Sequence, residues 1–305
     1  MKTIVSYVPH GINDSEYFPI PETHVDYTEF SQFKKQFRDD NNVDFIVFWN
    51  NRNVRRKNPG DVILSFKAFC DSLSDADASR CALLMHTDLR DQNGTDLLAV
   101  KKAICPKYRV IFSDQKVPTK FLNYYYNLSD VTLNIASNEG FGLSSAESIM
   151  SGTPVINNVT GGLQDQMRFT DDAGNWITFD SILQSNHIGK YKEHGDWAYP
   201  VFPSNRSLQG SFPTPYIFDD RCSYTDVAKG IMWWFLMAPL DRRRLGLQGR
   251  EWMLSRESGM SAKEMGRRMK ESINYTIDNF VKRSRYDVIK VENEKEIDDK
   301  SLSLK

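Results

Sequence analysis

Residues Ser137–Glu147 have the sequence SNEGFGLSSAE and join a predicted strand to a predicted helix. Before them, Val131–Ala136 (VTLNIA) alternates apolar residues as a strand does, and Leu143–Met150 predicts a short helix that Ser151 and Gly152 end. The next segment, TPVIN, is typical of another strand. The pattern therefore predicts a strand, a glycine turn, a helix and a strand in succession.

Such a unit favours an anionic ligand. Free backbone amides and the helix dipole give partial positive charge beyond the carboxyl end of the strand. Gly140 and Gly142 allow the backbone close to a ligand, and Phe141 between them can cover it. Glu139 and Glu147, eight positions apart, would flank the anion, where sugar hydroxyls are suitable donors to them.

Each residue of this stretch also has an ordinary interpretation. Ser144 and Glu147 have the spacing of a capping box, in which the glutamate only satisfies a backbone amide. Glu139 could be a solvated loop acid, and glycine pairs occur in many turns that bind no ligand. The combination favours a site over these alternatives.

The stretch SNEGFGLSSAESIMSGTPVIN resembles the signature of retaining glycosyltransferases of the GT-B fold, especially family 4 (group 1). FWNNRNVRRKN, at Phe48–Asn58, is similar to the strand, arginine and lysine of that family, and PTKFLNYYYNLSD and TGGLQDQ follow in the family's order. The resemblance is strongest over Asp44–Gln166. It implies a carboxyl-terminal, donor-binding GT-B domain.

Composition indicates a globular enzyme domain of 305 residues, 40% hydrophobic, with a net charge of −1. The chain has no apolar run of about 20 residues and no signal-peptide pattern, so we expect a cytoplasmic protein without a transmembrane segment. Near-zero charge gives no support to nucleic-acid binding. The four cysteines lack CxxC spacing, which predicts buried thiols rather than disulfides or a zinc site.

From Asp44 onward, predicted strands and helices alternate, which indicates an α/β fold with one doubly wound, Rossmann-like parallel sheet. The predicted strands are FIVFW, CALLMH, RVIF, VTLNIA and PVIN, and the predicted helices are Asp61–Leu73, Leu97–Ala103, Thr119–Leu128 and Leu143–Met150. Ligands of such sheets bind beyond the carboxyl ends of the strands. Five side chains should converge there: Arg52, Lys57, His86, Ser113 and Glu139.

The position of a segment relative to this edge also tests an alternative interpretation, in which two aspartates form a metal site. Asp75 and Asp77, in SDADAS, have the spacing of a metal-binding pair but precede the strand CALLMH. We therefore expect them at the opposite edge as solvated acids, and we predict no metal site.

Arg52 and Lys57 have the charge that cleavage of a sugar diphosphate requires, because negative charge develops on the leaving group. The alternative is that RNVRRK is a solvated basic loop. With the resemblance, Arg52 and Lys57 are the preferred pair, and Arg55 and Arg56 are expected at the surface. His86 is more typical of a structural residue.

The resemblance also implies a domain organisation. Residues 1–20 are similar to the linker of two-domain GT-B enzymes, residues 21–285 form the donor-binding domain, and residues 286–305 form a charged, disordered tail. The amino-terminal, acceptor-binding domain is then expected from a separate partner. The aromatic-rich insertion 176–220 could be a lid, an acceptor platform, a docking surface or a packed loop.

A closing helix that starts with the capping box Ser261 and Glu264 carries an apolar stripe. The stripe consists of Met265, Met269, Ile273, Ile277 and Phe280. Such a stripe is normally core, but the last helix of the family runs toward the amino-terminal domain. Part of the stripe is therefore expected to be exposed.

The implied function is transfer of a sugar from a UDP- or GDP-linked donor, with retention of configuration and without a metal cofactor. Arg52 and Lys57 would stabilise the diphosphate, and Glu139 and Glu147 would bind the donor sugar and the ribose. Amides of the turn Gly140, Phe141, Gly142 and Leu143 would hold a phosphate, and the loop 113–118 would contact the base. The alternative is a non-catalytic nucleotide-sugar binding subunit. An oxidoreductase is disfavoured because no glycine fingerprint follows the first strand.

Overall fold

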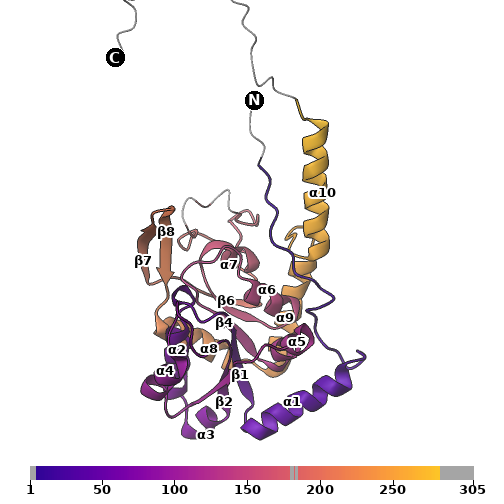
Figure 1. Ribbon diagram of the computed structural model, residues 1–305. Coiled ribbons are helices and arrows are strands. Elements are labelled where there is room, and N and C mark those ends of the chain that lie inside the picture. Colours follow the sequence, from indigo (N-terminus) through magenta and orange to yellow (C-terminus); the bar gives the residue numbers. More distant parts are fainter. Residues whose placement is uncertain (1–4, 179–181, 183–184, 282–305) are drawn as a thin grey trace, which may run out of the picture.

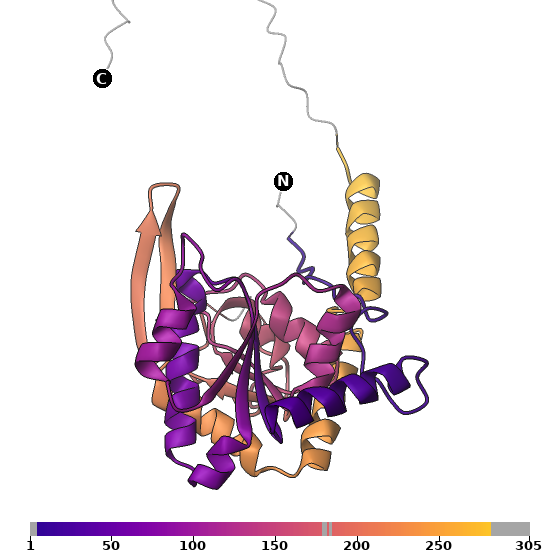
Figure 2. The same cartoon turned by 60° about the horizontal axis from the view of Figure 1, so that its bottom comes forward.

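A computed structural model describes residues 5–178, 182 and 185–281 of the chain. Its centre is a parallel sheet of six strands in the order β3-β2-β1-β4-β5-β6, with helices on both faces (Figures 1 and 2). The strands are β1 (Phe45–Asn50), β2 (Cys81–His86), β3 (Arg109–Ser113), β4 (Val131–Asn134), β5 (Val155–Asn158) and β6 (Ala198–Val201). The doubly wound α/β prediction is confirmed.

The four helices predicted from the sequence are all present, and their ends differ from the predicted ends by at most two residues. The helices of the described chain are α1 (Tyr27–Asn41), α2 (Pro59–Asp71), α3 (Asp75–Ser79), α4 (Leu97–Ile104), α5 (Thr119–Leu128), α6 (Leu143–Met150), α7 (Gly161–Gln166), α8 (Tyr224–Leu236), α9 (Pro239–Leu254) and α10 (Ala262–Asp278). A short 3-10 helix, η1 (Arg55–Lys57), follows β1. Helix α2 starts earlier than expected because Pro59 fits the first helical position.

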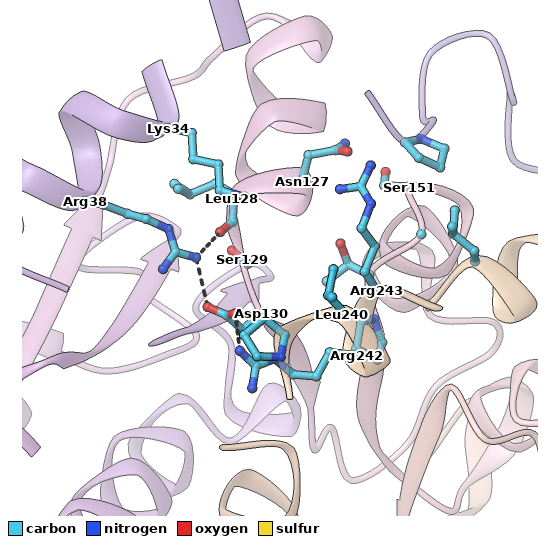
Figure 3. Close-up of a pocket in the computed structure, with 16 residues that line it drawn as sticks. Lys34, Arg38, Asn127, Leu128, Ser129, Asp130, Ser151, Leu240, Arg242 and Arg243 are labelled. Carbon is cyan, nitrogen blue, oxygen red and sulfur yellow. Dashed lines mark hydrogen bonds and ion pairs between the residues drawn. The ribbon is translucent and has the colours of Figure 1, made fainter. Parts of the chain in front are cut away.

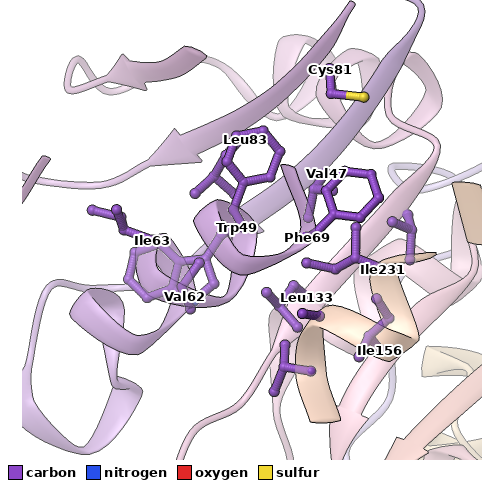
Figure 4. Close-up of a cluster of buried hydrophobic side chains, with 14 of the residues drawn as sticks. Val47, Trp49, Val62, Ile63, Phe69, Cys81, Leu83, Leu133, Ile156 and Ile231 are labelled. Carbon is purple, nitrogen blue, oxygen red and sulfur yellow. The ribbon is translucent and has the colours of Figure 1, made fainter. Parts of the chain in front are cut away.

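The core is divided by the sheet into two layers. In β1, Val47 and Trp49 belong to the cluster under α2 and α8 (Figure 4). Ile46 and Phe48 belong to the cluster on the opposite face of the sheet. All four side chains are buried, as expected for a central strand covered on both faces. This burial anchors β1 and therefore fixes where the loop after it begins.

The insertion 176–220 contributes to the core sheet rather than forming only a surface loop. Its strand β6 pairs with β5, and the indole of the preceding Trp197 donates a hydrogen bond of 3.1 Å to the carbonyl of Gln166. A two-stranded antiparallel hairpin, β7 (Asn205–Ser211) and β8 (Thr214–Arg221), then projects from the body (Figures 1 and 2). Period-two patterning was too weak to predict these strands from sequence.

The closing helix α10 extends away from the sheet (Figures 1 and 2). Ser261 caps it by accepting a hydrogen bond from the amide of Glu264, as the sequence predicted. None of its residues is buried, and Ile273 and Ile277 are 55% and 67% exposed. The expectation of a partly exposed stripe is confirmed. The predicted disordered tail, 286–305, lies outside the described residues.

The linker-like segment runs beside the start of α10. Ile12 pairs with Ser261 in an isolated parallel bridge, and the amide of Ile12 donates to the carbonyl of Met260 at 2.9 Å. Ile12 itself is buried. The linker-like segment and the chain that leads into α10 therefore stabilise each other.

All four cysteine side chains are buried as free thiols, which confirms the prediction of buried thiols.

In the described part of the chain, no helix is both long enough and apolar enough to cross a membrane.

The segment before β6 encloses a histidine among aromatic rings. The ring of His187 lies 4.3 Å from that of Phe169 and 5.5 Å from that of Phe202, between centroids. The side chain is buried, and neither ring nitrogen has a hydrogen-bond partner among the described residues. Burial lowers the pKa of His187 to about 4, because the imidazolium would lose its hydration there.

We predict that His187 makes the fold sensitive to acid. The unfolded chain binds a proton at about pH 6.5 that the folded chain resists, so stability present above about pH 6.5 is lost as the pH falls toward 4. The loss of folding free energy over this pH range should be about 2 to 3 kcal/mol in the parent protein and should be absent in His187→Leu. Urea unfolding at a series of pH values measures it. Identical profiles for parent and variant would contradict the assignment.

Candidate functional site

The candidate site lies where the strand order reverses. β1 and β4 are neighbours in the sheet, but the connections from them lead to opposite sides, so their carboxyl ends open a crevice. The two loops are tied together, because the amide of Ser137 donates to the carbonyl of Arg56 at 2.7 Å. The side chain of Asn58 also donates to the carbonyl of Ile135 at 2.9 Å. This edge is where the sequence placed the ligand.

Lys57 and Glu139 meet across this crevice. The Lys57 ammonium donates to a carboxylate oxygen of Glu139 and, at 2.7 Å, to the side-chain oxygen of Asn51. The second carboxylate oxygen of Glu139 accepts from Arg56 at 3.0 Å. Lys57 and Glu139 are each only 9% exposed. The structure therefore brings together two of the three predicted catalytic residues and adds Arg56 to them.

Burial lowers the pKa of the Lys57 ammonium, and the neighbouring Glu139 carboxylate opposes that shift. The cluster contains two cations, Arg56 and Lys57, and one carboxylate. An excess positive charge in a crevice of this kind favours an anionic ligand. Next to it, the buried amide nitrogen of Asn51 has no acceptor among the described residues and could donate to such a ligand.

Arg52 lies elsewhere on the same loop. Its guanidinium donates to Asp91 at 2.7 Å, and its side chain is 63% exposed. Arg56, which the sequence assigned to the surface, is half exposed but contacts Glu139. The turn of η1 explains why Arg56 rather than Arg52 contacts Glu139, because it places Arg56 and Lys57 beside the loop after β4. No periodic pattern in RNVRRK indicates which of its arginines faces the crevice.

The glycine turn is fixed by a second glycine turn packed against it. Gly142 has a φ of 92°, and a Cβ atom there would lie 2.4 Å from Leu163. Gly161 has a φ of 47°, and its Cβ atom would lie 2.0 Å from the carbonyl oxygen of Glu139. Both positions therefore require glycine. Gln166 also holds the turn, because its side chain donates to the carbonyl of Phe141 at 2.7 Å.

Helix α6 begins at this turn with Gly142 as its N-cap and no side-chain cap. The capping-box interpretation of Ser144 and Glu147 is thus wrong, because Ser144 lies inside the first turn. The amides of the first turn have no intrahelical acceptors. Leu143, at its start, is 47% exposed, and Gly140 faces open space. The turn therefore presents free backbone amides beside open space.

Glu147 lies one turn further along α6 and is half buried. One of its carboxylate oxygens accepts a hydrogen bond of 2.7 Å from the hydroxyl of Tyr126, which in turn accepts from Asn50 at 2.8 Å. Burial raises the pKa of Glu147, and the Tyr126 and Tyr17 hydroxyls oppose the shift. The carboxylate is therefore oriented by aromatic hydroxyls rather than by a helix cap.

A cavity of about 360 Å³ adjoins the glycine turn on the side of the linker-like segment. The ring of His10 stacks on Phe141 at 5.6 Å, and the hydroxyl of Tyr7 donates to Asp165 at 2.7 Å. Burial raises the pKa of Asp165 to about 6. The sequence predicts no role for Tyr7, His10 or Asp165, because only the fold brings the linker-like segment and TGGLQDQ to the turn.

The other predicted edge residues lie further along the sheet. His86 and Ser113, which end β2 and β3, hydrogen-bond each other at 3.0 Å, and burial lowers the pKa of His86. Asp75 pairs with Lys107 and Asp77 contacts Ser74, at the beginning of β2 and away from the crevice, as expected. No cluster of three or more His, Cys, Asp or Glu side chains in the described segments is arranged to hold a metal ion.

No protein-family model matches the chain, and no curated protein sequence matches it. Solved structures do. Sucrose-phosphate synthase from Thermosynechococcus elongatus superposes with a TM-score of 0.56 at 19% identity, over 89% of this chain and 52% of that one. A glycosyltransferase from Rickettsia africae gives 0.56 at 17%, over 90% and 57%. Anabaena HepE, in complex with UDP and glucose, gives 0.55 at 13%, over 87% and 55%.

These neighbours are glycosyltransferases with the GT-B fold. At such identities the likeness shows the fold alone, which is the Rossmann-like fold of a GT-B domain. The chain spans about half the length of the solved chains that it matches.

We predict that the buried pair stabilises the crevice only as a pair. Glu139→Gln leaves the Lys57 ammonium buried without its carboxylate, so the free energy of unfolding should fall by roughly 3 kcal/mol. Lys57→Met added to Glu139→Gln should recover much of that loss. Urea unfolding of the two single variants and the double variant gives the coupling energy. Arg52→Gln, at the exposed Asp91 pair, is the control and should change little. Additive costs at Lys57 and Glu139 would contradict the coupling.

Proposed function

We propose that this domain binds a nucleotide diphosphate sugar and transfers the sugar to an acceptor. The observation that carries the proposal is the position of Lys57, Arg56 and Glu139 beside the uncapped start of α6, at the reversal of strand order. Cations and free helix amides at one edge suit a diphosphate. The GT-B fold of the neighbours supports the same ligand class.

In the proposed mechanism, the diphosphate leaves as the bond to the sugar breaks, and its negative charge develops next to Lys57 and Arg56. Cations fixed before the reaction stabilise that charge without reorganisation. Amides of Leu143 and the turn before it would bind a phosphate oxygen. These groups would offset the leaving-group charge without a metal ion. Arg52 could assist only after leaving Asp91.

Glu139 is proposed to orient the donor sugar rather than to attack it. Both of its carboxylate oxygens already accept hydrogen bonds from cations, which lowers their nucleophilicity and fixes their direction. Sugar hydroxyls can donate to the lone pairs that remain. Retention of configuration is inferred from the resemblance of the SNEGFGLSSAE motif to retaining enzymes. Glu147, oriented by Tyr126, would accept hydrogen bonds from the ribose.

The acceptor site is proposed to require a second half. The aligned region covers 52%, 57% and 55% of the three neighbouring chains, so each contains a part with no counterpart in the match. We propose that a separate domain or subunit supplies that half and closes over the crevice. The presence of UDP in the Anabaena neighbour supports a uridine donor.

We predict that UDP stabilises the domain through Lys57. UDP at 100 times its dissociation constant should add about 2.7 kcal/mol, a rise of a few degrees in unfolding temperature. GDP, ADP and NAD are the comparison ligands. Lys57→Gln should weaken UDP binding roughly tenfold or more, because a charge-assisted hydrogen bond is lost. Arg52→Gln, on the same loop but paired with Asp91, is the matched control. Equal losses in both variants, or no response to any nucleotide, would count against the site.

We predict that Glu147 recognises the ribose. The parent protein should bind UDP more tightly than 2′-deoxy-UDP, and Glu147→Gln should reduce that preference, because the neutral amide accepts hydrogen bonds more weakly than the carboxylate. Isothermal titration with both nucleotides measures it. Glu251→Gln, exposed on α9, is the control. An unchanged preference in Glu147→Gln would exclude this role.

A further inference from the structure

A second cavity lies at the other end of the sheet, where the strands begin. It has a volume of about 200 Å³ and lies between α1, the end of α5 and the start of α9 (Figure 3). Ser129 and Asp130, just before β4, and Thr153 and Pro154, just before β5, form part of its wall. It is therefore separate from the crevice that holds Lys57 and Glu139.

The wall of this cavity carries an excess of positive charge. Four cationic side chains line it, against the single carboxylate of Asp130. They are Lys34, Arg38, Arg242 and Arg243. They come from α1 and α9, so the fold brings the arginine run at the start of α9 together with two cations from a distant part of the sequence. A cavity lined mainly by one sign of charge attracts counter-ions, here anions.

Two of the four cations have structural partners. Arg38 donates to Asp130 at 3.0 Å and to the carbonyl of Leu128 at 2.9 Å. Arg242 donates to the other oxygen of Asp130 at 2.9 Å and to the carbonyl of Met237 at 2.6 Å. Figure 3 shows Asp130 between the two arginines. The only carboxylate in the wall is thus already shared.

The other two cations have no such partners. Neither Lys34 nor Arg243 has a hydrogen-bond or ion-pair partner among the described residues. Lys34 is half buried, with its ammonium 5.9 Å from the centre of the Phe30 ring. Burial is the main cause that lowers the pKa of Lys34, and the charges of Arg38 and Arg243 lower it further, while the carboxylate of Asp130 opposes the shift. The Arg243 side chain extends toward Asn127 and Ser151 (Figure 3).

We propose that this cavity binds a phosphate-bearing anion between Lys34 and Arg243. Guanidinium and ammonium donors together suit phosphate oxygens, and the cavity offers both, while the carboxylate of Asp130 is already paired with Arg38 and Arg242. Its volume suits a phosphate or diphosphate group rather than a complete nucleotide sugar. The source is a soluble phosphate compound or a lipid headgroup, since Leu240 at the rim is 82% exposed.

The site would be joined to the donor crevice by α6. The N-cap of that helix, Gly142, lies in the crevice, and its C-cap, Ser151, lines this cavity. The binding claim itself does not depend on the proposed transferase activity, because none of its residues contacts the crevice cluster.

The test uses the full chain with pyrophosphate as the probe, in buffers whose ionic strength is matched with chloride. The unfolding temperature of the parent should rise, and Lys34→Gln with Arg243→Gln should reduce the affinity roughly tenfold or more. Arg244→Gln, next in sequence but paired with Asp241, is the control. In chloride alone, the double variant should be at least as stable as the parent, because a repulsion is removed. A second arm measures cosedimentation with vesicles of phosphatidic acid in phosphatidylcholine, against phosphatidylcholine alone.

A loss of pyrophosphate or vesicle binding caused by Lys34→Gln with Arg243→Gln, seen also in a background where Lys57→Gln weakens the donor crevice and not caused by Arg244→Gln, would support the site and name the source. Loss in Lys57→Gln alone would place the anion in the donor crevice and overturn this proposal while leaving the transferase proposal intact. An unchanged response in the double variant, or no binding of pyrophosphate and vesicles by the parent, would also overturn it.

Discussion

The reversal of strand order between β1 and β4 is the constraint on which the site depends. A parallel sheet can connect its strands on both faces only if the order changes direction somewhere, and at that point the loops diverge. Here the loop after β1 carries Arg56 and Lys57, and the loop after β4 carries Glu139 and the glycine turn. The sheet therefore places cations, a carboxylate and helix amides around one opening.

The opening is held in shape by interactions that a ligand can use. Two glycine turns pack so closely that side chains at Gly142 and Gly161 would collide with neighbouring atoms. The Lys57 and Glu139 pair keeps charged groups in a buried position without a ligand, since each satisfies the other. A diphosphate would find donors already oriented, which lowers the reorganisation that binding and bond cleavage require.

The opposite end of the sheet shows a different arrangement of charge. Asp130 holds Arg38 and Arg242 in place, and this leaves Lys34 and Arg243 unneutralised at the same cavity. The two ends share β4 and α6, so Asp130 and Glu139 lie before and after one short strand. One structural unit thus links two positively charged cavities in a chain with a net charge of only −1.

The sequence alone determined the fold class and the strands β1 to β5, because periodicity, glycine turns and the order of the elements along the chain can be read from local patterns. It also predicted a site at Lys57, Glu139 and the turn from Gly140 to Leu143. Only the tertiary structure decided that Arg56 rather than Arg52 contacts Glu139, that Tyr126 orients Glu147, and that Tyr7, His10 and Asp165 line a cavity beside the turn. These contacts join segments far apart in the chain, and their geometry depends on how the loops pack.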